Sequence, residues 1–468
     1  MQAAIAIAQS QKARSFELRA ALALAKLYHA ANRDADAHAA LTSAVEGFPP
    51  TQQFPELTEA QTLLAALSES DAVKSAAALR QRRVHLQTSL GNALIWAKGY
   101  HAPETSAAFA RARELASRED DASERFSAYY GLSVGHLARG DPAPLRETAE
   151  LLLREATAHP NRPEALIAHR NFAGTRFYFG DFAGAHDHYQ KAMELYDQAR
   201  HADFANRFGQ DPRPAAEVFD AIALWLLGRV DEALRLADRA VADAKSAAHA
   251  PTTGFVHAYR AVLGLLRCQP DAVAADSETL AAIVSEYDLP AFLAGWATFF
   301  QGWAKWSDAA EESSLAQMRR GVAICREQGF VWLLPSLEAA LAAAEASAGE
   351  TDAGVRRLDD ALAELERTEH RWYEAEMHRI RGEILLKCDP AKTAAAEQSL
   401  QAAIAIAQQQ KARSFELRAA LALAKLYRGA NRDADAHAAL APAVEGFPPT
   451  QQFPELTEAQ TLLAALSR

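Results

Sequence analysis

Residues 180–192 read GDFAGAHDHYQKA, and the spacing within this stretch decides the fold class. After the turn residue Gly180, small or apolar side chains follow at Phe182, Ala185, Tyr189 and Ala192. Steps of three and four residues place these side chains on one face of a helix. The small Ala185 lets a second helix cross closely, and Gly180 sits where a helix ends and the chain turns. The stretch therefore predicts the turn and second helix of a helical hairpin.

This pattern recurs along the chain with a period of about forty residues. The positions equivalent to Ala185 are Thr105, Leu145, Ala233, Val273, Leu315, Gly354, Ala396 and Ala436. A tetratricopeptide unit has ~34 residues, so each unit here carries about six more. The longest step, from Ala185 to Ala233, contains an insertion at residues 209–214. We expect an all-α, right-handed superhelical solenoid of tetratricopeptide-like helix–turn–helix repeats, in which each unit packs on its neighbours.

The composition narrows the classes of function. Half of the residues are hydrophobic (50%), only 8% are aromatic, and the net charge is −11. Nucleic acids and anionic membranes both attract clustered cations, so we expect neither as a partner. Three widely spaced cysteines, Cys268, Cys325 and Cys388, argue against a disulfide framework or a zinc site. We find no signal peptide and no apolar run of the ~18 residues that span a membrane, and expect a cytoplasmic protein.

The two ends of the chain are nearly identical. Residues 2–68 recur as residues 401–467, with five differences over 67 positions. Diverged structural repeats rarely agree so closely, which indicates a recent copy. We expect residues 1–69 to be a duplicated copy of the C-terminal cap repeat. Residues 70–468 would then be the solenoid, with the original cap at residues 400–468.

Several short segments carry a family resemblance. They are LIWAKGY with APE (94–100, 102–104), YFGDF (178–182), RFGQDP (207–212), ALWLLG (223–228), WYEAEMHR with GE (372–379, 382–383), FELRAA (415–420), and EGF with LTEA (445–447, 456–459). Through them, residues from about 70 to 468 resemble the C-terminal tetratricopeptide-like domain of large bacterial regulators. In that family a class III adenylate/guanylate cyclase domain or a transcriptional-activator module precedes a signal-transduction ATPase. The resemblance implies a sensor or scaffold that binds a ligand and regulates the attached module.

The enzymatic parts of that family are missing from this sequence. It contains no G-x-x-x-x-G-K-[ST] phosphate loop and no paired aspartates of the cyclase type. His186 and His188 are two positions apart, which places them about 200° apart on a helix, so they cannot share a metal ion. We expect a non-catalytic domain without cofactor or metal. Its partner would be a protein or peptide, or a small effector.

The ending motif also occurs near the start, as EGF and LTEA at residues 46–48 and 57–60. The first copy therefore looks like a displaced cap, and engineering, recombination and natural fusion could each produce it. Its apolar receiving face, with candidates Ile5, Leu18, Leu22 and Ala25, is expected to be uncovered.

The uncovered face leads to an alternative function. If it accepts the helix at residues 372–387 of another molecule, the contact is head-to-tail and makes rings or fibres. The chain would then be a self-assembly element, whose duplicated ends drive oligomerisation or domain swapping. In the other interpretation the first copy packs on residues 70–98 as an extra repeat and leaves a monomer.

The insertion supplies the first candidate ligand residues, Arg207, Gln210 and Asp211. Arg207 and Gln210 could hold a carboxylate or phosphate from a loop that reaches into the superhelix. Alternatively, Asp211 caps a helix whose first residue is Pro212.

Aromatic residues supply the other candidates. The stretch at residues 295–306 is rich in aromatic side chains, and Trp296 and Trp303 could form a wall for a peptide or apolar ligand. Their helical spacing fits the core of a helical array equally well. Tyr178 is a further candidate for the groove.

A charged strip near residue 372 has two interpretations. Arg371, Glu376 and Arg379 could lie on one helix face as a binding strip. We interpret them as a solvated ladder, with Trp372, also a groove candidate, in the packing layer.

Overall fold

A computed structural model of the chain describes residues 1–10, 13–46, 48–49, 54–68, 71–116, 122–448, 451 and 453–466. Two sequence expectations fall outside these ranges. One is the boundary between residues 69 and 70, and the other is Gly47 in the N-terminal ending motif.

Of the described residues, 83% are helical, and no strand occurs among them. The prediction of an all-α fold is therefore confirmed. The helices form two compact units, which we call unit 1 (Met1–Leu86) and unit 2 (Gln87–Arg468).

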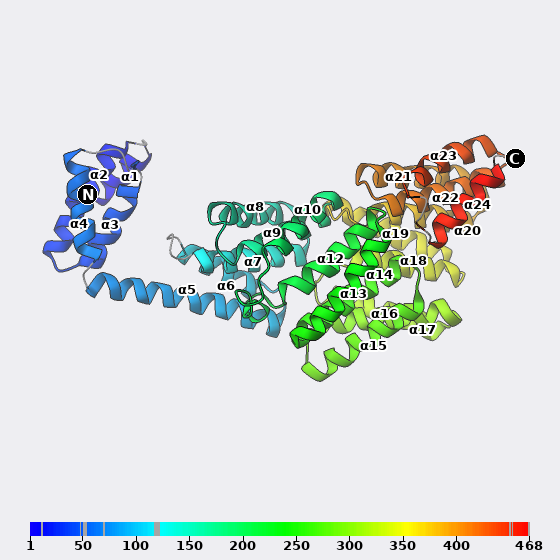
Figure 1. Cartoon of the computed structure of the whole chain (residues 1–468), viewed down its shortest axis with the longest axis horizontal. Helices are drawn as coiled ribbons and strands as arrows, with labels where there is room; N and C mark the ends of the chain where they lie inside the picture. Colours follow the sequence, from blue (N-terminus) through cyan, green and yellow to red (C-terminus); the bar gives the residue numbers. More distant parts are fainter. Residues whose placement is uncertain are drawn as a thin grey trace. The chain divides into compact units, whose positions relative to one another are not determined.

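Unit 1 contains the N-terminal copy as four helices that pack in chain order (Figure 1). They are α1 (Gln2–Ser10), α2 (Arg14–Ala30), α3 (Asp34–Glu46) and α4 (Pro55–Ser68). The long helix α5 (Asp71–Lys98) follows and crosses the border between the two units.

The prediction of which residues form the uncovered face of the N-terminal copy was wrong. Leu18, Leu22 and Ala25 are buried, because α2 packs against α1, α3 and α4 through them. The large apolar side chains that this copy leaves exposed are Ile7 and Leu27, together with Phe16, which is 67% exposed. The four helices of the copy thus bury among themselves the apolar face of α2 that the sequence suggested would receive a neighbouring repeat.

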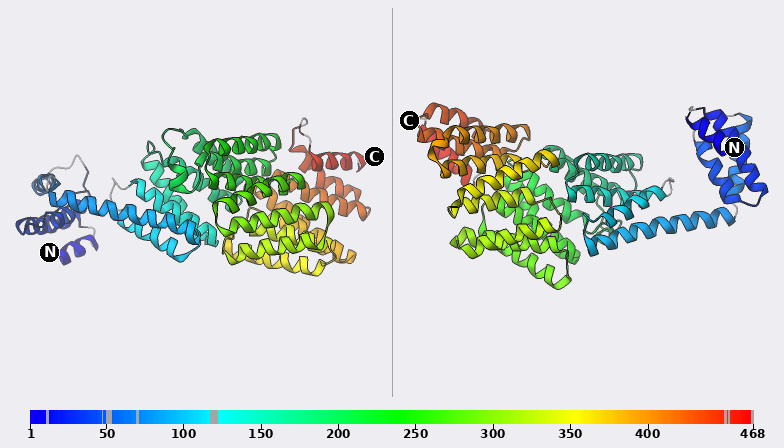
Figure 2. Two further views of the ribbon diagram at one scale, coloured as in Figure 1. Left: turned by 90° about the horizontal axis from the view of Figure 1, so that it is seen from below. Right: turned by 180° about the vertical axis from the view of Figure 1, so that it is seen from behind.

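Unit 2 is a right-handed superhelical solenoid of helical hairpins (Figures 1 and 2). Helix α6 (Pro103–Leu115), whose Phe109 packs against Ile95 of α5, precedes the hairpins, and α24 (Pro454–Leu466) follows them. The hairpins are α7 (Ala122–Arg139) with α8 (Pro142–Ala158), α9 (Ala165–Tyr178) with α10 (Phe182–Glu194), α12 (Pro212–Leu226) with α13 (Val230–Ala247), α14 (Ala250–Leu266) with α15 (Pro270–Tyr287), α16 (Ala291–Ala309) with α17 (Glu312–Glu327), α18 (Leu334–Ser347) with α19 (Thr351–Thr368), α20 (Glu374–Cys388) with α21 (Thr393–Gln409), and α22 (Arg413–Gly429) with α23 (Asp433–Glu445).

The turns between paired helices lie where the repeat pattern places them. Gly180 and Gly228 have φ angles of 82° and 84°, and Asn431 has a φ of 58°. Left-handed residues of this kind end a helix and reverse the chain. At the first of them, the Asp181 amide donates to the Arg176 carbonyl oxygen at 2.9 Å, which closes the turn.

The repeated small or apolar position forms the seams between helices, as the pattern predicts. All nine of these positions are buried, from Thr105 in α6 to Ala436 in α23. At Gly354 in α19, an added Cβ would lie 2.7 Å from the Ala342 carbonyl oxygen of α18. The close crossing of these two helices therefore requires a residue without a side chain.

Successive turns of the superhelix contact one another. The Tyr178 hydroxyl donates to the Thr368 carbonyl oxygen at 3.1 Å, over a separation of 190 residues. The Ser414 hydroxyl donates to the Trp225 carbonyl oxygen at 2.5 Å, over 189 residues. One superhelical turn thus holds between four and five hairpins of about forty residues. Contact between the turns encloses the inner faces of the first helices.

Candidate functional site

A cavity of about 110 Å³ lies in unit 2 and is lined mainly by the first helices of successive hairpins. Ten of its sixteen lining residues are aromatic, although aromatic residues make up only 8% of the chain. The principal rings come from successive repeats and are Tyr130, Tyr189, Phe219, Tyr259, Trp296 and Trp332. This concentration makes the cavity the leading candidate for a ligand site.

The aromatic wall is held together by contacts between its own rings. The centroids of Phe219 and Tyr259 lie 4.3 Å apart, and those of Tyr259 and Trp296 lie 5.7 Å apart. Phe292 and Phe330 stack at 4.4 Å with their planes within 9° of parallel. Such pairs contribute about 0.5–1.5 kcal/mol each beyond their buried area. The wall is therefore preformed and does not depend on a ligand.

One charged side chain, Arg170 of α9, lines the cavity. It is only 8% exposed, and its Nη2 donates to the Tyr130 hydroxyl at 2.7 Å while its Nη1 donates to Gln210 Oε1 at 3.2 Å. The Tyr130 hydroxyl in turn donates to the Phe208 carbonyl oxygen at 3.2 Å. No carboxylate oxygen in the described ranges lies within 4.0 Å of the guanidinium. Arg170 is thus a buried cation held by neutral acceptors.

Three buried donors on the wall have no acceptor among the described residues. They are the Tyr189 hydroxyl, Trp296 Nε1 and Trp332 Nε1. Burial raises the pKa of Tyr189 well above its ordinary value, so this hydroxyl stays a neutral donor. A buried donor without an acceptor costs about 1–3 kcal/mol. A ligand with acceptor oxygens would relieve that cost at each donor that it reaches.

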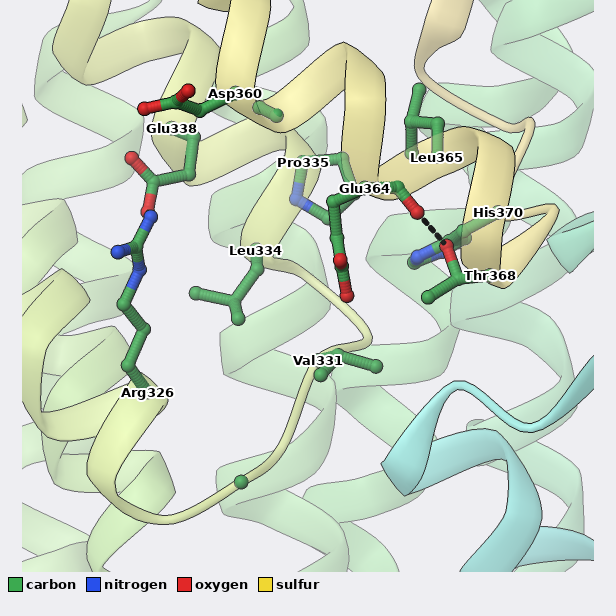
Figure 3. A pocket seen from close by; sticks show the side chains of 12 residues that line it. Arg326, Val331, Leu334, Pro335, Glu338, Asp360, Glu364, Leu365, Thr368 and His370 are labelled. Atoms are coloured by element: carbon green, nitrogen blue, oxygen red, sulfur yellow. Dashed lines mark hydrogen bonds and ion pairs between the residues drawn. The ribbon is translucent and has the colours of Figure 1, made fainter. Parts of the chain in front are cut away.

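A second cavity, of about 370 Å³, lies beside α18 and α19 (Figure 3). Of its charged lining residues, Glu338 lies 2.6 Å from Arg326 and also 2.6 Å from Arg357 outside the lining. Glu364, also in the lining, pairs with Arg367 at 2.5 Å. Burial lowers the pKa of His370 to about 3, and its ring stacks on Tyr178 at a centroid distance of 3.9 Å. Three of the four charged lining residues thus have ion-pair partners within the protein, which makes this cavity the weaker candidate.

The structure places the three insertion candidates in different roles. Gln210 lines the aromatic cavity and accepts a hydrogen bond from Arg170. Arg207, in the short helix α11 (Phe204–Phe208), instead ties the insertion to α7. It donates to Glu164 at 2.6 Å and to Ser127 at 2.9 Å, and lies away from the cavity lining.

Asp211 takes the role of a helix cap. Its Oδ1 accepts a hydrogen bond from the Arg213 amide at 3.0 Å, and α12 begins at Pro212. The capping interpretation is therefore confirmed.

The aromatic candidates also separate. Trp296 is buried and lines the cavity. Tyr178 and Trp372 are buried where successive superhelical turns meet, and Trp372 lies 5.5 Å from the Phe177 ring. Trp303 is half-buried against the main core. None of these last three lines the aromatic cavity.

Sequence reasoning missed most of the cavity, including Arg170 and Tyr130. A usable signal was present, because Phe219 and Tyr259 are separated by forty residues, which is one repeat. Aromatic residues that recur at the repeat period on the first helix of each hairpin point to the inner surface. The repeat pattern instead describes the second helix of each hairpin, which forms the seams and contributes only Tyr189 to the sixteen residues of the cavity lining.

Within the ranges that the structure describes, no group of three or more His, Cys, Asp or Glu side chains could hold a metal ion. None of the helices in those ranges combines the length and apolarity that crossing a bilayer requires.

No family model matches the chain. A search of curated proteins finds an uncharacterized protein of Rhizobium meliloti (strain 1021) that is 26% identical over 397 residues. The matched region covers 84% of this chain and 36% of that protein. The chain thus spans about a third of the length of this relative.

Solved structures show the fold. A Rap protein in complex with Competence and Sporulation Factor is similar with a TM-score of 0.53 and 12% identity, over 82% of this chain and 99% of that one. A Signal Transduction ATPase with Numerous Domains protein with a tetratricopeptide repeat sensor, from Pyrococcus horikoshii, has a TM-score of 0.41 and 11% identity, over 92% and 69% of the two chains. The first likeness supports a helical repeat solenoid and nothing about ligands.

Proposed function

We propose that this chain is a non-catalytic binding scaffold or sensor, whose ligand enters the aromatic cavity of unit 2. The observation that carries the proposal is the preformed aromatic wall, whose buried donors have no acceptor among the described residues. The ligand is a small effector or a side chain of a bound protein or peptide. An extended helical repeat suits this task, because its inner surface is continuous and rigid before binding.

Ligand binding would regulate a signalling module attached to this region in a longer protein. The family resemblance supports an ATPase or cyclase module as the regulated part. The length of the Rhizobium meliloti relative agrees with additional domains, since the matched region covers only 36% of it. Binding to one state of the solenoid would bias the module by the difference in affinity between its states.

A neutral aromatic probe tests the cavity. We expect phenylacetamide to bind the whole chain with a Kd on the order of 1 mM, as measured by calorimetry, since small ligands of this size gain only a few kcal/mol. Gly174 lines the cavity, and a Cβ there would lie 3.8 Å from the Tyr189 hydroxyl, an ordinary contact. Gly174→Leu should fill the cavity and weaken binding at least about tenfold.

Gly174→Ala is the matched control, because its methyl group fits without displacing the wall. This variant should bind phenylacetamide like the unmodified chain. Absence of binding to both the unmodified chain and the alanine variant would contradict the proposed function. Equal binding by the leucine variant would place the probe elsewhere.

Self-assembly remains the second candidate, because Phe16 of the N-terminal copy is 67% exposed. The helix expected to receive this copy, α20, already packs against α21 and α22 of the C-terminal copy. Assembly would therefore take the form of exchange, in which one copy replaces the other on a partner molecule. Light scattering over a hundredfold concentration range should then show a mass that rises with concentration, and deletion of residues 1–69 should abolish the rise. A constant monomer mass would exclude it.

A further inference from the structure

We propose that the aromatic cavity of unit 2 binds a small carboxylic acid, whose carboxylate pairs with Arg170 while its apolar group lies against the aromatic wall. This inference rests on the proposed ligand-binding function and adds the charge and size of the ligand. It follows from the juxtaposition of one buried guanidinium with a wall of aromatic rings.

No carboxylate oxygen of the described residues lies within 4.0 Å of the Arg170 guanidinium. Burial raises the pKa of Asp211, although this residue is near enough for the charge of Arg170 to oppose that rise with a smaller effect. The acids of the adjacent helix α12 and of its N-cap are engaged elsewhere, and Glu217 pairs with Arg239 at 2.9 Å. Asp211 caps that helix, and Asp220 lies 2.7 Å from His186 and 2.7 Å from Gln190. Buried charges are normally paired, because removing a lone ion from water is costly. A ligand carboxylate supplies the missing negative charge.

The geometry of the cation suits a carboxylate. The Tyr130 hydroxyl and Gln210 Oε1 accept from separate nitrogens and hold the guanidinium in one orientation at the wall. A planar guanidinium held in this way can recognise a carboxylate with two parallel hydrogen bonds.

The lining sets the number of charges and the size. Arg170 is the only charged residue of the sixteen that line the cavity, which favours a monoanion over a phosphate dianion. The volume of about 110 Å³ is of the order of the ~150 Å³ cavity that admits benzene, so the apolar group is no larger than one ring.

Phenylacetate and phenylacetamide form a matched pair of probes, because they differ mainly in charge. We expect phenylacetate to bind the unmodified chain at least about tenfold more tightly in calorimetry, since charge-assisted hydrogen bonds are roughly twice as strong as neutral ones. A short peptide that ends in a free phenylalanine carboxylate serves as a third probe. Tighter binding of phenylacetate than of this peptide identifies a free acid as the source of the carboxylate, and the reverse order identifies a chain terminus.

Gln210→Glu provides a variant of nearly unchanged shape. Its new carboxylate would lie beside Arg170 and compete with the ligand, so phenylacetate should bind about tenfold more weakly while phenylacetamide is unaffected. Arg170→Met is the second variant and should abolish the preference for the acid. Equal affinity of the unmodified chain for the two probes would overturn the carboxylate assignment and leave the proposed function standing. Binding of neither probe would overturn both.

Discussion

Replacing Phe415 by alanine is expected to lower the free energy of unfolding of the C-terminal copy by about 3–5 kcal/mol. The same replacement at Phe16, the equivalent residue of the N-terminal copy, should change it by less than about 0.5 kcal/mol. Phe415 is 1% exposed and lies between Trp225 and Tyr373, at ring-centroid distances of 5.9 and 5.6 Å. Phe16 is 67% exposed, so its removal leaves no cavity.

The chain supplies its own control for this comparison. Both phenylalanines lie in the sequence RSFELRAALALAKLY, at residues 14–28 and 413–427. Helix propensity and local contacts are therefore matched, and only the surroundings differ. Urea denaturation measures the loss. Hydrogen exchange of the α2 and α22 amides separates the two copies, because a cap can open locally without global unfolding. Equal losses at the two positions would contradict the packing described for unit 2.

Replacing Arg418 by methionine is expected to destabilise the C-terminal copy by about 3–5 kcal/mol, because it removes one of the two guanidinium groups that pair with the buried Glu376. The Arg418 side chain is 9% exposed, lies 3.3 Å from Glu376, and also contacts Glu455 and the Leu266 carbonyl oxygen. Its guanidinium lies 5.0 Å from the centroid of the Trp225 ring. This cluster joins the C-terminal copy to three earlier helices of unit 2, α12, α14 and α20.

Glu376 in this cluster corrects a sequence expectation. The residue was assigned to a solvated ladder, but it is 2% exposed and pairs with Arg379 at 2.8 Å. Burial by itself would raise the pKa of Glu376, and Arg379 and Arg418 together outweigh it and lower the pKa. The ladder interpretation failed because α22, more than thirty residues later in the chain, covers this face of α20.

Arg19 is the internal control for Arg418. Its side chain is 60% exposed and pairs with Glu56 at 2.7 Å. Exposed ion pairs contribute little, so Arg19→Met should leave the urea midpoint unchanged. The double variant Arg418→Met with Glu376→Gln should recover part of the lost stability, because it removes a buried charge as well as its partner. A single variant Arg418→Met with the stability of the unmodified chain would refute the buried cluster.

The repeat architecture could be predicted because its signals are local. Gly180 ends a helix through its own backbone conformation. Ala185 faces the preceding helix α9, from which it is separated only by the turn at Gly180. Each hairpin repeats both signals, so a weak match in one hairpin does not prevent recognition of the repeat. The helix start at Pro212 was predictable for the same reason, since Asp211 caps it through a hydrogen bond to the next turn.

The candidate site was only partly predictable, because it depends on contacts between distant repeats. Arg207 and Gln210 are three residues apart, yet only Gln210 lines the cavity. What separates them is α7, some eighty residues earlier, whose Ser127 binds Arg207. Arg170 was missed because nothing near it in sequence marks it as a buried cation without a carboxylate partner.

Equivalent residues of the two copies show which structural features follow from the local sequence and which depend on distant helices. Leu18 and Leu417 are buried in both copies, because the helices that cover them belong to the same short segment. Phe16 and Phe415 have the same neighbours in sequence but opposite exposure. Helix boundaries and the internal seams therefore follow from the local pattern. Whether the outer face of a segment is exposed or buried depends on which distant helices pack against it. The sequence of the segment itself does not contain this information.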